Sequence, residues 1–303
     1  MSVPVPVAPV RVAPAAAIDR RRARRRLNRR RITRRIVLNL VGLLVFAVMV
    51  FPVYWMVSTA FKPGLDILSY TPKWIPRPAT LANFRDAIGK PYFWDNVRNS
   101  VIIVGVVVAL SLVLAFLAAL ALAKFRFYGR TAFIVLVIGV QMVPLNALII
   151  PLYILLARTE QVNKLSGVIA TYLTFVLPFC VWTLRGFMLG VPAELEEAAM
   201  VDGSTRFGAF VRILLPLVAP GLVATSIFAF IQAWNEFIIA YVLLSSPEKQ
   251  TLTVWLASFT SLRGTDWGSL MAGATLTAIP VVVFFVAVHR RIAFGLTAGA
   301  VRG

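Results

Sequence analysis

The most informative segment of the chain is 197–216, which reads Glu-Ala-Ala-Met-Val-Asp-Gly-Ser-Thr-Arg-Phe-Gly-Ala-Phe-Val-Arg-Ile-Leu-Leu-Pro. It lies between two apolar segments, 167–189 and 217–244, and each of them is long enough to cross a bilayer as a helix. Two membrane helices therefore hold this polar connector at the water interface from both sides. We expect an ordered loop there rather than a free linker.

Composition places the rest of the chain in a membrane as well. Hydrophobic residues make up 59% of the 303 positions and charged residues 14%, whereas soluble domains carry about 25% charged residues. The apolar residues form six blocks, at 36–61, 101–123, 131–157, 167–189, 217–244 and 270–288. These runs do not alternate as the strands of a β-barrel would. The expected fold class is an all-α polytopic membrane protein with six transmembrane helices.

The basic residues predict how this helical protein is oriented. If the chain crosses the membrane six times, three basic clusters and the 190–216 loop share one side; the clusters are 20–35, 124–130 and 289–291. Basic loops face the cytoplasm, so we expect both termini to be cytoplasmic. The opposite side receives the longer loops 62–98 and 245–268, which are the natural landing surface for an external protein.

The N-terminal segment carries much of the net charge of +19, since 20–35 alone holds eleven arginines. An arginine run can bind nucleic acid or anionic lipid. Directly before a first span, it is better explained as a topology anchor that also contacts acidic headgroups. We expect residues 1–35 to form a disordered cytoplasmic tail that contacts membrane lipid and binds no nucleic acid.

No group of residues in the sequence suggests catalysis or metal binding. Cys180 is the one cysteine and His289 the one histidine, and no Gly-x-x-x-x-Gly-Lys-Ser/Thr phosphate-binding loop occurs. We therefore expect no catalytic residue, no metal and no cofactor bound by this chain. Any use of ATP would belong to a partner.

The first part of the 190–216 loop has the local features of a helix. Pro192 suits the first turn of a helix, where no amide donor is needed. Acidic side chains follow in that turn and favour the positive helix end; they are Glu194, Glu196 and Glu197. Ala198 and Ala199 continue the helix and leave a surface that another protein can approach closely.

The second part of the loop predicts a turn and a second helix. Gly203 can adopt the left-handed conformation that ends a helix. Ser204 or Thr205 can cap a second helix that runs toward Pro216 and the next span. A pair of helices joined at a glycine and attached at both ends to membrane helices would transmit a mechanical force to those membrane helices.

The spacing in this loop resembles the cytoplasmic coupling loop of ABC-type importer permeases. The matching positions, with Asp202 beside them, are Glu197, Ala198, Ala199, Gly203, Ile213, Leu215 and Pro216. Over roughly 35–303 the chain is similar to the carbohydrate type, and in particular to the smaller maltose-type permease subunit. Further matching stretches are 51–55, 99–100, 142–144, 150–153, 184–187, 233–237 and the ending 295–303.

The resemblance implies a type I ABC importer in a bacterial plasma membrane, taking up a sugar or oligosaccharide. This chain would pair with a second homologous permease subunit and two cytoplasmic ATPase subunits, which bind ATP-Mg. An extracytoplasmic solute-binding protein would deliver the solute. The resemblance also implies that 295–303 reaches between the ATPases, with Leu296 and Thr297 as contact candidates; a frayed end is the alternative. The domains expected are 1–35, 36–294 and 295–303.

Polar residues inside the apolar blocks are candidates for the solute pathway, because such groups are costly in a membrane. They are Gln232, Trp234, Asn235 and Glu236 in one block and Gln141 and Asn146 in another. Trp182, Trp234 and Tyr153 could offer aromatic faces to a sugar. The alternative is hydrogen bonding between helices, which we favour for Gln141 and Asn146 and leave open for Asn235 and Glu236.

Two smaller expectations concern local structure. A short helix is predicted at 81–88, capped by Thr80. Prolines are expected to break or kink their spans; they are Pro52, Pro144, Pro151, Pro178 and Pro280. An ion-coupled secondary transporter is the rival function, although it usually has an internal repeat, and we find none.

Overall fold

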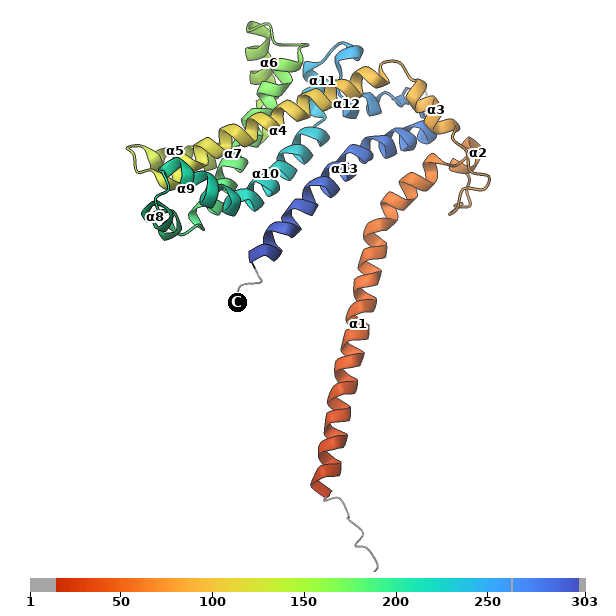
Figure 1. Ribbon diagram of the computed structural model, residues 1–303. Helices are drawn as coiled ribbons and strands as arrows, with labels where there is room; N and C mark the ends of the chain where they lie inside the picture. Colours follow the sequence, from red (N-terminus) through yellow and green to blue (C-terminus); the bar gives the residue numbers. More distant parts are fainter. Residues whose placement is uncertain (1–14, 263, 300–303) are drawn as a thin grey trace, which may run out of the picture. The chain divides into compact units, whose positions relative to one another are not determined.

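The computed structural model describes residues 15–262 and 264–299, with side chains described for 32–262 and 264–288. The chain divides into two compact units, 1–55 and 56–303. The described part of the first unit is a single helix, since α1 spans Ala15–Ala60 and crosses the boundary between the units (Figure 1). From residue 36 onward this helix is apolar on all sides, as a membrane span should be.

We expected disorder throughout residues 1–35, but from residue 15 onward the structure is helical. Helix α1 begins at Ala15, so the arginines of 20–35 extend the helix of the first apolar block toward the N-terminus. Arginine is a good helix former, and an existing helix is extended more easily than a new one is nucleated. Residues 1–14 lie outside the described residues, where the expectation of disorder stays a prediction.

Four long helices are the largest elements in the described part of the second unit (Figure 1). They are α4 (Phe93–Lys124), α7 (Leu165–Leu189), α10 (Leu215–Asn235) and α13 (Trp267–Gly299). At one end, called the α8 end, lie α8 (Ala193–Val201), α9 (Arg206–Ala209) and the π-helix η2 (Phe210–Leu214). At the other, called the α12 end, lie α2 (Gly64–Ile67), α3 (Ala82–Gly89), α11 (Ile238–Leu243), η3 (Pro247–Lys249), α12 (Leu252–Ala257) and a two-stranded antiparallel hairpin of β1 (Thr260–Ser261) and β2 (Gly264–Thr265).

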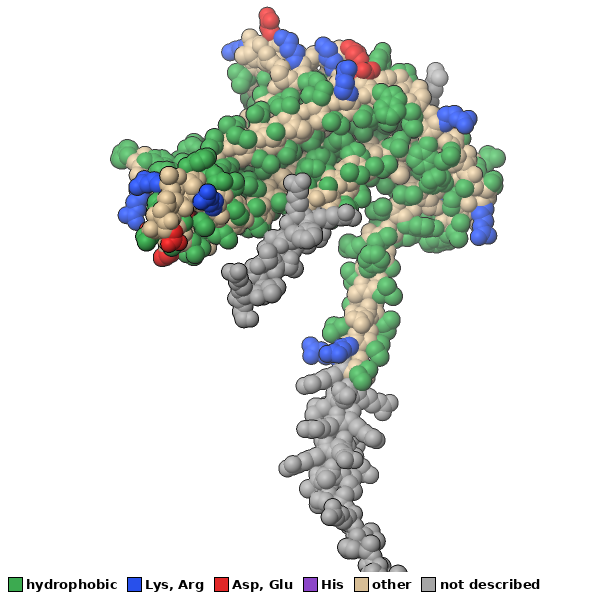
Figure 2. Space-filling model, viewed as in Figure 1, with side chains coloured by type: hydrophobic (Ala, Val, Ile, Leu, Met, Phe, Trp, Pro, Cys, Tyr) green, Lys and Arg blue, Asp and Glu red, His purple; other side chains and the backbone are tan. Residues whose placement is uncertain are grey.

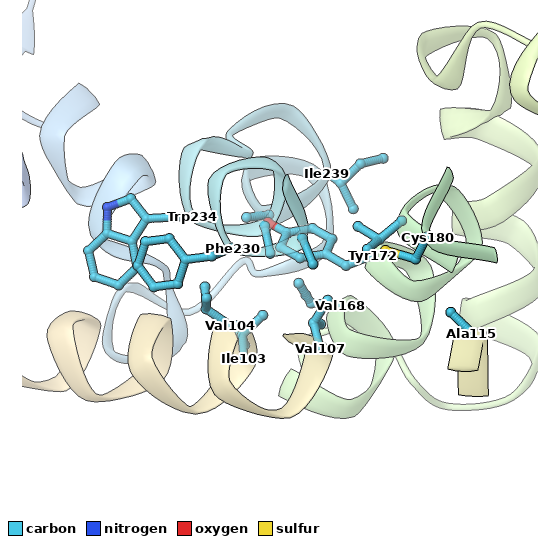
Figure 3. Packing of buried hydrophobic residues seen from close by; sticks show 14 of the residues in the cluster. Ile103, Val104, Val107, Ala115, Val168, Tyr172, Cys180, Phe230, Trp234 and Ile239 are labelled. Atoms are coloured by element: carbon cyan, nitrogen blue, oxygen red, sulfur yellow. The ribbon is translucent and has the colours of Figure 1, made fainter. Parts of the chain in front are cut away.

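The core lies where α4 packs on α7 and α10. Figure 3 shows Ile103 and Val107 of α4 facing Val168 and Tyr172 of α7, all of them fully buried. Farther along α4, small alanines including Ala115 are also fully buried and let the helices approach closely. On the face drawn in Figure 2, charged side chains of the second unit gather at its ends and hydrophobic ones cover the region between.

The apolar blocks correspond to helices, but two blocks are broken. Among the described residues five helices can span a membrane, or six if one bent pair is a single span. That pair replaces the predicted continuous helix 131–157: α5 (Arg130–Gln141) is followed by η1 (Leu145–Leu148) and α6 (Ile149–Arg158) with a bend of 92°. The bend coincides with Pro144, one of the predicted breaks, because proline disfavours a helical residue before it.

The block 217–244 is also not one helix. Helix α10 ends at Asn235, Glu236 has extended backbone, and α11 restarts at Ile238. By contrast Pro52, Pro178 and Pro280 lie inside helices that continue past them. Pro151 lies in the first turn of α6, where its missing N–H costs little.

Candidate functional site

The 190–216 loop has the predicted helix–glycine–helix arrangement. Helix α8 begins directly after Pro192 and ends at Val201. Gly203 then adopts a left-handed backbone with φ of +90°. The Thr205 hydroxyl accepts a hydrogen bond from the Gly208 N–H at 3.0 Å and caps α9. The predictions for Gly203 and Thr205 are confirmed, whereas Pro192 lies directly before the helix and not in its first turn.

The second helix of the loop is not separate from the next span. Residues 206–235 form one continuous helical segment, in which η2 joins α9 to α10. In η2 the Leu215 N–H bonds to the Phe210 carbonyl, five residues back. Pro216 has no N–H to return to the Arg212 carbonyl and its ring crowds the preceding turn. The Leu-Pro part of the motif therefore coincides with a π-helical turn, which sequence reasoning missed.

An ion pair ties this loop to a third helix. The Lys124 ammonium, at the last residue of α4, lies 2.5 Å from a carboxylate oxygen of Glu196 in α8, and both side chains are about four-fifths buried. A cation at a helix C-terminus and an acid in a first helical turn each suit the helix dipole. The sequence suggested Glu196 as a first-turn acid only. Its pairing with Lys124, 72 positions away, was missed.

The loop exposes apolar side chains where water is expected. Val201 is 88% and Phe207 74% exposed. Of the motif residues, Glu197, Ala198, Asp202 and Pro216 are exposed, whereas Ala199, Ile213 and Leu215 are half-buried. A polar loop with exposed apolar side chains and small residues between them is suited to contact with another protein.

A cavity of about 490 Å³ lies between α5, η1, α7 and α10. Four of the predicted pathway residues line it, namely Gln141, Gln232, Asn235 and Glu236. The rest of its wall includes Thr174 and three phenylalanines, Phe175, Phe179 and Phe228, of which the last two stack at 3.7 Å between ring centroids. The cavity wall contains no lysine or arginine.

The other pathway candidates do not line this cavity. Trp234 is buried, and its indole N–H donates to the Thr277 carbonyl of α13 at 3.2 Å. Asn146 is exposed in η1. Trp182 and Tyr153 are also outside the cavity wall. Gln141, for which we favoured bonding between helices, is near the Val137 carbonyl of its own helix.

Glu236 makes several hydrogen bonds within the chain. Its carboxylate accepts the backbone N–H groups of Ile239 at 2.8 Å and Ala240 at 3.1 Å, and the Tyr172 hydroxyl at 2.6 Å. Its backbone carbonyl accepts the Thr253 hydroxyl. The carboxylate thus caps α11 and satisfies amides that the break in the span would leave unpaired. A tyrosine within an apolar block was the available sign of this contact, since a buried Tyr hydroxyl usually has a partner.

At the α12 end, Thr80 receives the Ala82 N–H at 3.1 Å, close to the predicted cap, and α3 begins at Ala82. Lys90 donates to the Ser258 carbonyl at 2.7 Å and lies 3.8 Å above the Phe259 ring. Burial lowers the pKa of the Lys90 ammonium, and the Asp266 carboxylate opposes that shift. Leu296 and Thr297 lie in helix α13, but the structure does not describe their side chains.

The comparisons with known proteins identify the family. The model of the family described as binding-protein-dependent transport system inner membrane component matches residues 111–297. The chain belongs to this family. The matched region contains the 190–216 loop, the cavity between α5, η1, α7 and α10, and the ion pair at Lys124.

Several curated relatives match most of the chain. The diacetylchitobiose uptake system permease protein DasC of Streptomyces coelicolor is 46% identical over 252 residues, covering 83% of this chain and 91% of that protein. The trehalose transport system permease protein SugB of Mycobacterium tuberculosis is 35% identical, covering 83% and 92%. The predicted resemblance to binding-protein-dependent importer permeases is confirmed.

A solved structure shares the fold. The crystal structure of a bacterial ABC transporter involved in the import of the acidic polysaccharide alginate matches with a TM-score of 0.71 at 21% identity, covering 84% of this chain and 95% of that one. The chain is therefore a helical membrane component of a transport system, with the fold of an ABC importer permease.

Proposed function

We propose that this chain is the permease subunit of an ATP-driven importer for an uncharged sugar or oligosaccharide. The observation that carries the proposal is the 190–216 loop, which exposes Val201 and Phe207 while α7, α10 and Lys124 hold it in place. A loop fixed in this way can receive force from a cytoplasmic ATPase subunit and pass it to membrane helices. Its proposed contact residues are Glu197, Ala198, Ala199, Asp202, Gly203, Ile213, Leu215 and Pro216.

The proposed topology has six spans, with the bent pair of α5 and α6 counted as one. It places the α8 end and both chain termini in the cytoplasm and the α12 end outside a bacterial plasma membrane. The basic segments 20–35, 124–130 and 289–291 support this orientation. The proposed domains stay the tail 1–35, the permease domain 36–294 and the tail 295–303, in which Leu296 and Thr297 are candidate ATPase contacts.

The cavity supports an uncharged solute. Gln141, Gln232 and Asn235 offer neutral hydrogen-bonding groups, and phenylalanine rings offer the apolar faces that sugars use. The single charged group of the wall, Glu236, already accepts three hydrogen bonds. Relatives named for diacetylchitobiose and trehalose transport agree with this class, whereas the structural relative carries an acidic polysaccharide.

The family supports a proposal for the partners. We propose a second homologous permease subunit, two ATPase subunits that bind ATP-Mg, and an extracytoplasmic solute-binding protein that lands on the α12 end. The chain itself would be non-catalytic. One structural relative was solved in complex with a periplasmic protein bound to an alginate pentasaccharide, which supports the last of these partners.

Replacing Gly203 tests the function. Gly203 has a φ of +90°, which an L side chain rarely adopts, and open space around it. We expect Gly203→Val to distort the loop, so that solute uptake by the reconstituted importer falls at least about tenfold while ATP hydrolysis continues. Gly105→Ala in α4 also meets open space but has ordinary backbone, and it should transport normally. Normal coupling in Gly203→Val would remove the loop from the mechanism.

A further inference from the structure

Two neighbouring polar residues of α4 hold the segment that leads into α12. The Asn99 amide donates to the backbone carbonyls of Glu248 at 2.9 Å and Gln250 at 3.1 Å. The Ser100 hydroxyl accepts the Leu252 N–H at 2.8 Å. Both side chains are buried. The Asn-Ser pair matched a family stretch in the sequence, yet nothing in the proposed function so far requires it.

These bonds satisfy groups that the segment cannot pair by itself. Leu252 is the first residue of α12, and the first N–H groups of a helix have no partner inside it. Ser100 therefore acts as a cap supplied by another helix. With Asn99 bound to two carbonyls just before α12, the position of this segment depends on the position of α4.

The opposite end of α4 holds the 190–216 loop. Lys124 is the last residue of α4, and its ion pair with Glu196 lies in a partly buried setting. The same helix thus contacts a surface loop at each of its ends through side chains that face other elements.

The helix between these contacts is suited to act as one body. Ser100 and Lys124 are 24 residues apart, which corresponds to about 36 Å along an α-helix. Among the four long helices, α7, α10 and α13 each contain an internal proline in their described parts, at 178, 220 and 280, and α4 has none. Figure 1 shows α4 extending without a break from the α12 end to the α8 end.

We propose that α4 mechanically links the 190–216 loop to the extracytoplasmic segment 245–257. Asn99 and Ser100 are the positioning residues toward 245–257, and the Lys124–Glu196 pair is the contact with the 190–216 loop. The proposal rests on the proposed function, because it assigns the two ends to the ATPase and to the binding protein. Landing of the loaded binding protein on 245–257 would then reach the ATPase through α4.

The test uses the complete importer, reconstituted in lipid bilayers with its partner permease, ATPase subunits and binding protein. The rate of ATP hydrolysis is measured with and without solute-loaded binding protein, and their ratio is the stimulation. We expect Ser100→Ala to lower the stimulation about fivefold, the factor that one net hydrogen bond supplies. Ser100→Thr keeps the acceptor and should restore it. Ser226→Ala in α10 is the matched control, since the buried Ser226 hydroxyl donates to the Val223 carbonyl of its own helix.

The other end of α4 is tested in the same assay. Glu196→Gln removes the charge that faces Lys124, and we expect stimulation to fall by a similar factor. Glu194→Gln, which changes an exposed acid in the same helical turn, should not lower it. Exchanging the charges, with Lys124→Glu and Glu196→Lys combined, should recover only part of the stimulation, because the restored ion pair then opposes both helix dipoles.

The double variant of Ser100→Ala with Glu196→Gln decides whether the two ends act through one helix. Distant, independent sites have additive free-energy effects, so their fold losses multiply. Two breaks in one link should together cost no more than the larger single loss. Multiplying losses, or full stimulation in Ser100→Ala, would overturn the proposal.

The controls separate this proposal from the proposed function. If the unmodified importer shows no stimulation by the loaded binding protein, the proposed function fails. If loaded binding protein stimulates ATP hydrolysis equally in the unmodified importer and in Ser100→Ala, only the proposed role of α4 is contradicted. Should Ser100→Ala assemble poorly, Asn99→Ser provides the same comparison, because it removes the two bonds to 248 and 250, and full stimulation in it would overturn the proposal.

Discussion

Glu236 could be interpreted from the sequence either as a solute ligand or as a residue that makes hydrogen bonds within the protein. An acid deep in an apolar block suggests a solute ligand or a partner. In the structure its carboxylate accepts two backbone amides and the Tyr172 hydroxyl, so three of its roughly four acceptor sites are used within the chain. Glu236 therefore shapes the cavity by holding the break between α10 and α11, and we propose the neutral side chains beside it as the solute contacts.

Tyr172→Phe tests this assignment. The substitution removes one hydrogen bond to a charged acceptor, and we expect the protein to lose about 1–3 kcal/mol of stability. The thermal unfolding midpoint of the purified importer should fall, while the KM for solute uptake stays unchanged. Tyr153→Phe, at an exposed tyrosine of α6, should leave the midpoint in place. A raised KM with an unchanged midpoint would assign Tyr172 and Glu236 to solute binding instead.

The π-helix η2 determines how the 190–216 loop meets its membrane helix. A π-helical turn contains more residues than an α-helical turn, so its presence rotates the helix before it relative to the helix after it. The Leu215 N–H bonds five residues back to Phe210, next to a proline that lacks the donor for Arg212. The orientation of α9, and with it the exposed Phe207, depends on this turn.

Pro216→Ala supplies the missing N–H and should allow η2 to revert to α-helix. We expect a stable, membrane-inserted protein in which less solute is transported per ATP, by about fivefold or more, because the loop is rotated. Pro220→Ala, inside the regular part of α10, is the matched control and should keep the normal ratio. The ratio is measured in proteoliposomes, and a normal value for Pro216→Ala would show that the π-helical turn is dispensable.

The cavity that we propose for the solute is a product of the assembled bundle, because α5, η1, α7 and α10 each contribute part of its wall. The residues that meet there are distant in sequence, and the 92° bend after α5 brings η1 into the wall. The meeting of neutral polar groups and phenylalanine rings is the reason why we propose an uncharged carbohydrate as the solute.

Gln232→Leu tests the cavity. Replacing the amide by an apolar side chain of similar size removes one or two hydrogen bonds to the solute, so uptake should weaken about five- to fiftyfold. Asn146→Leu changes a similar amide outside the cavity wall and should have little effect. Uptake of the radiolabelled sugar at several concentrations gives KM. Equal KM values for the two variants would show that this cavity is not the pathway.

Local features were predictable because each depends on neighbouring residues alone. The apolar blocks predicted the spanning helices, Gly203 the left-handed turn, and Thr205 the cap. The break at Glu236 was missed, since it depends on how the Glu236 carboxylate caps α11 and on one hydrogen bond from Tyr172, 64 positions away in the sequence. The burial of Trp234 was missed for the same reason, because its partner Thr277 lies on a different helix.

The sequence by itself therefore determined a helical membrane protein, its family and the helix–glycine–helix arrangement of the 190–216 loop, but not its π-helical turn. Only the tertiary structure decided which side chains share the cavity, that Lys124 pairs with Glu196, and that Asn99 holds a segment 149 or more positions away. The physical reason is that lipid is as apolar as a helix surface, so hydrophobicity drives helices into the membrane without specifying which faces meet. Those faces are chosen by close packing and by scattered polar contacts between distant residues.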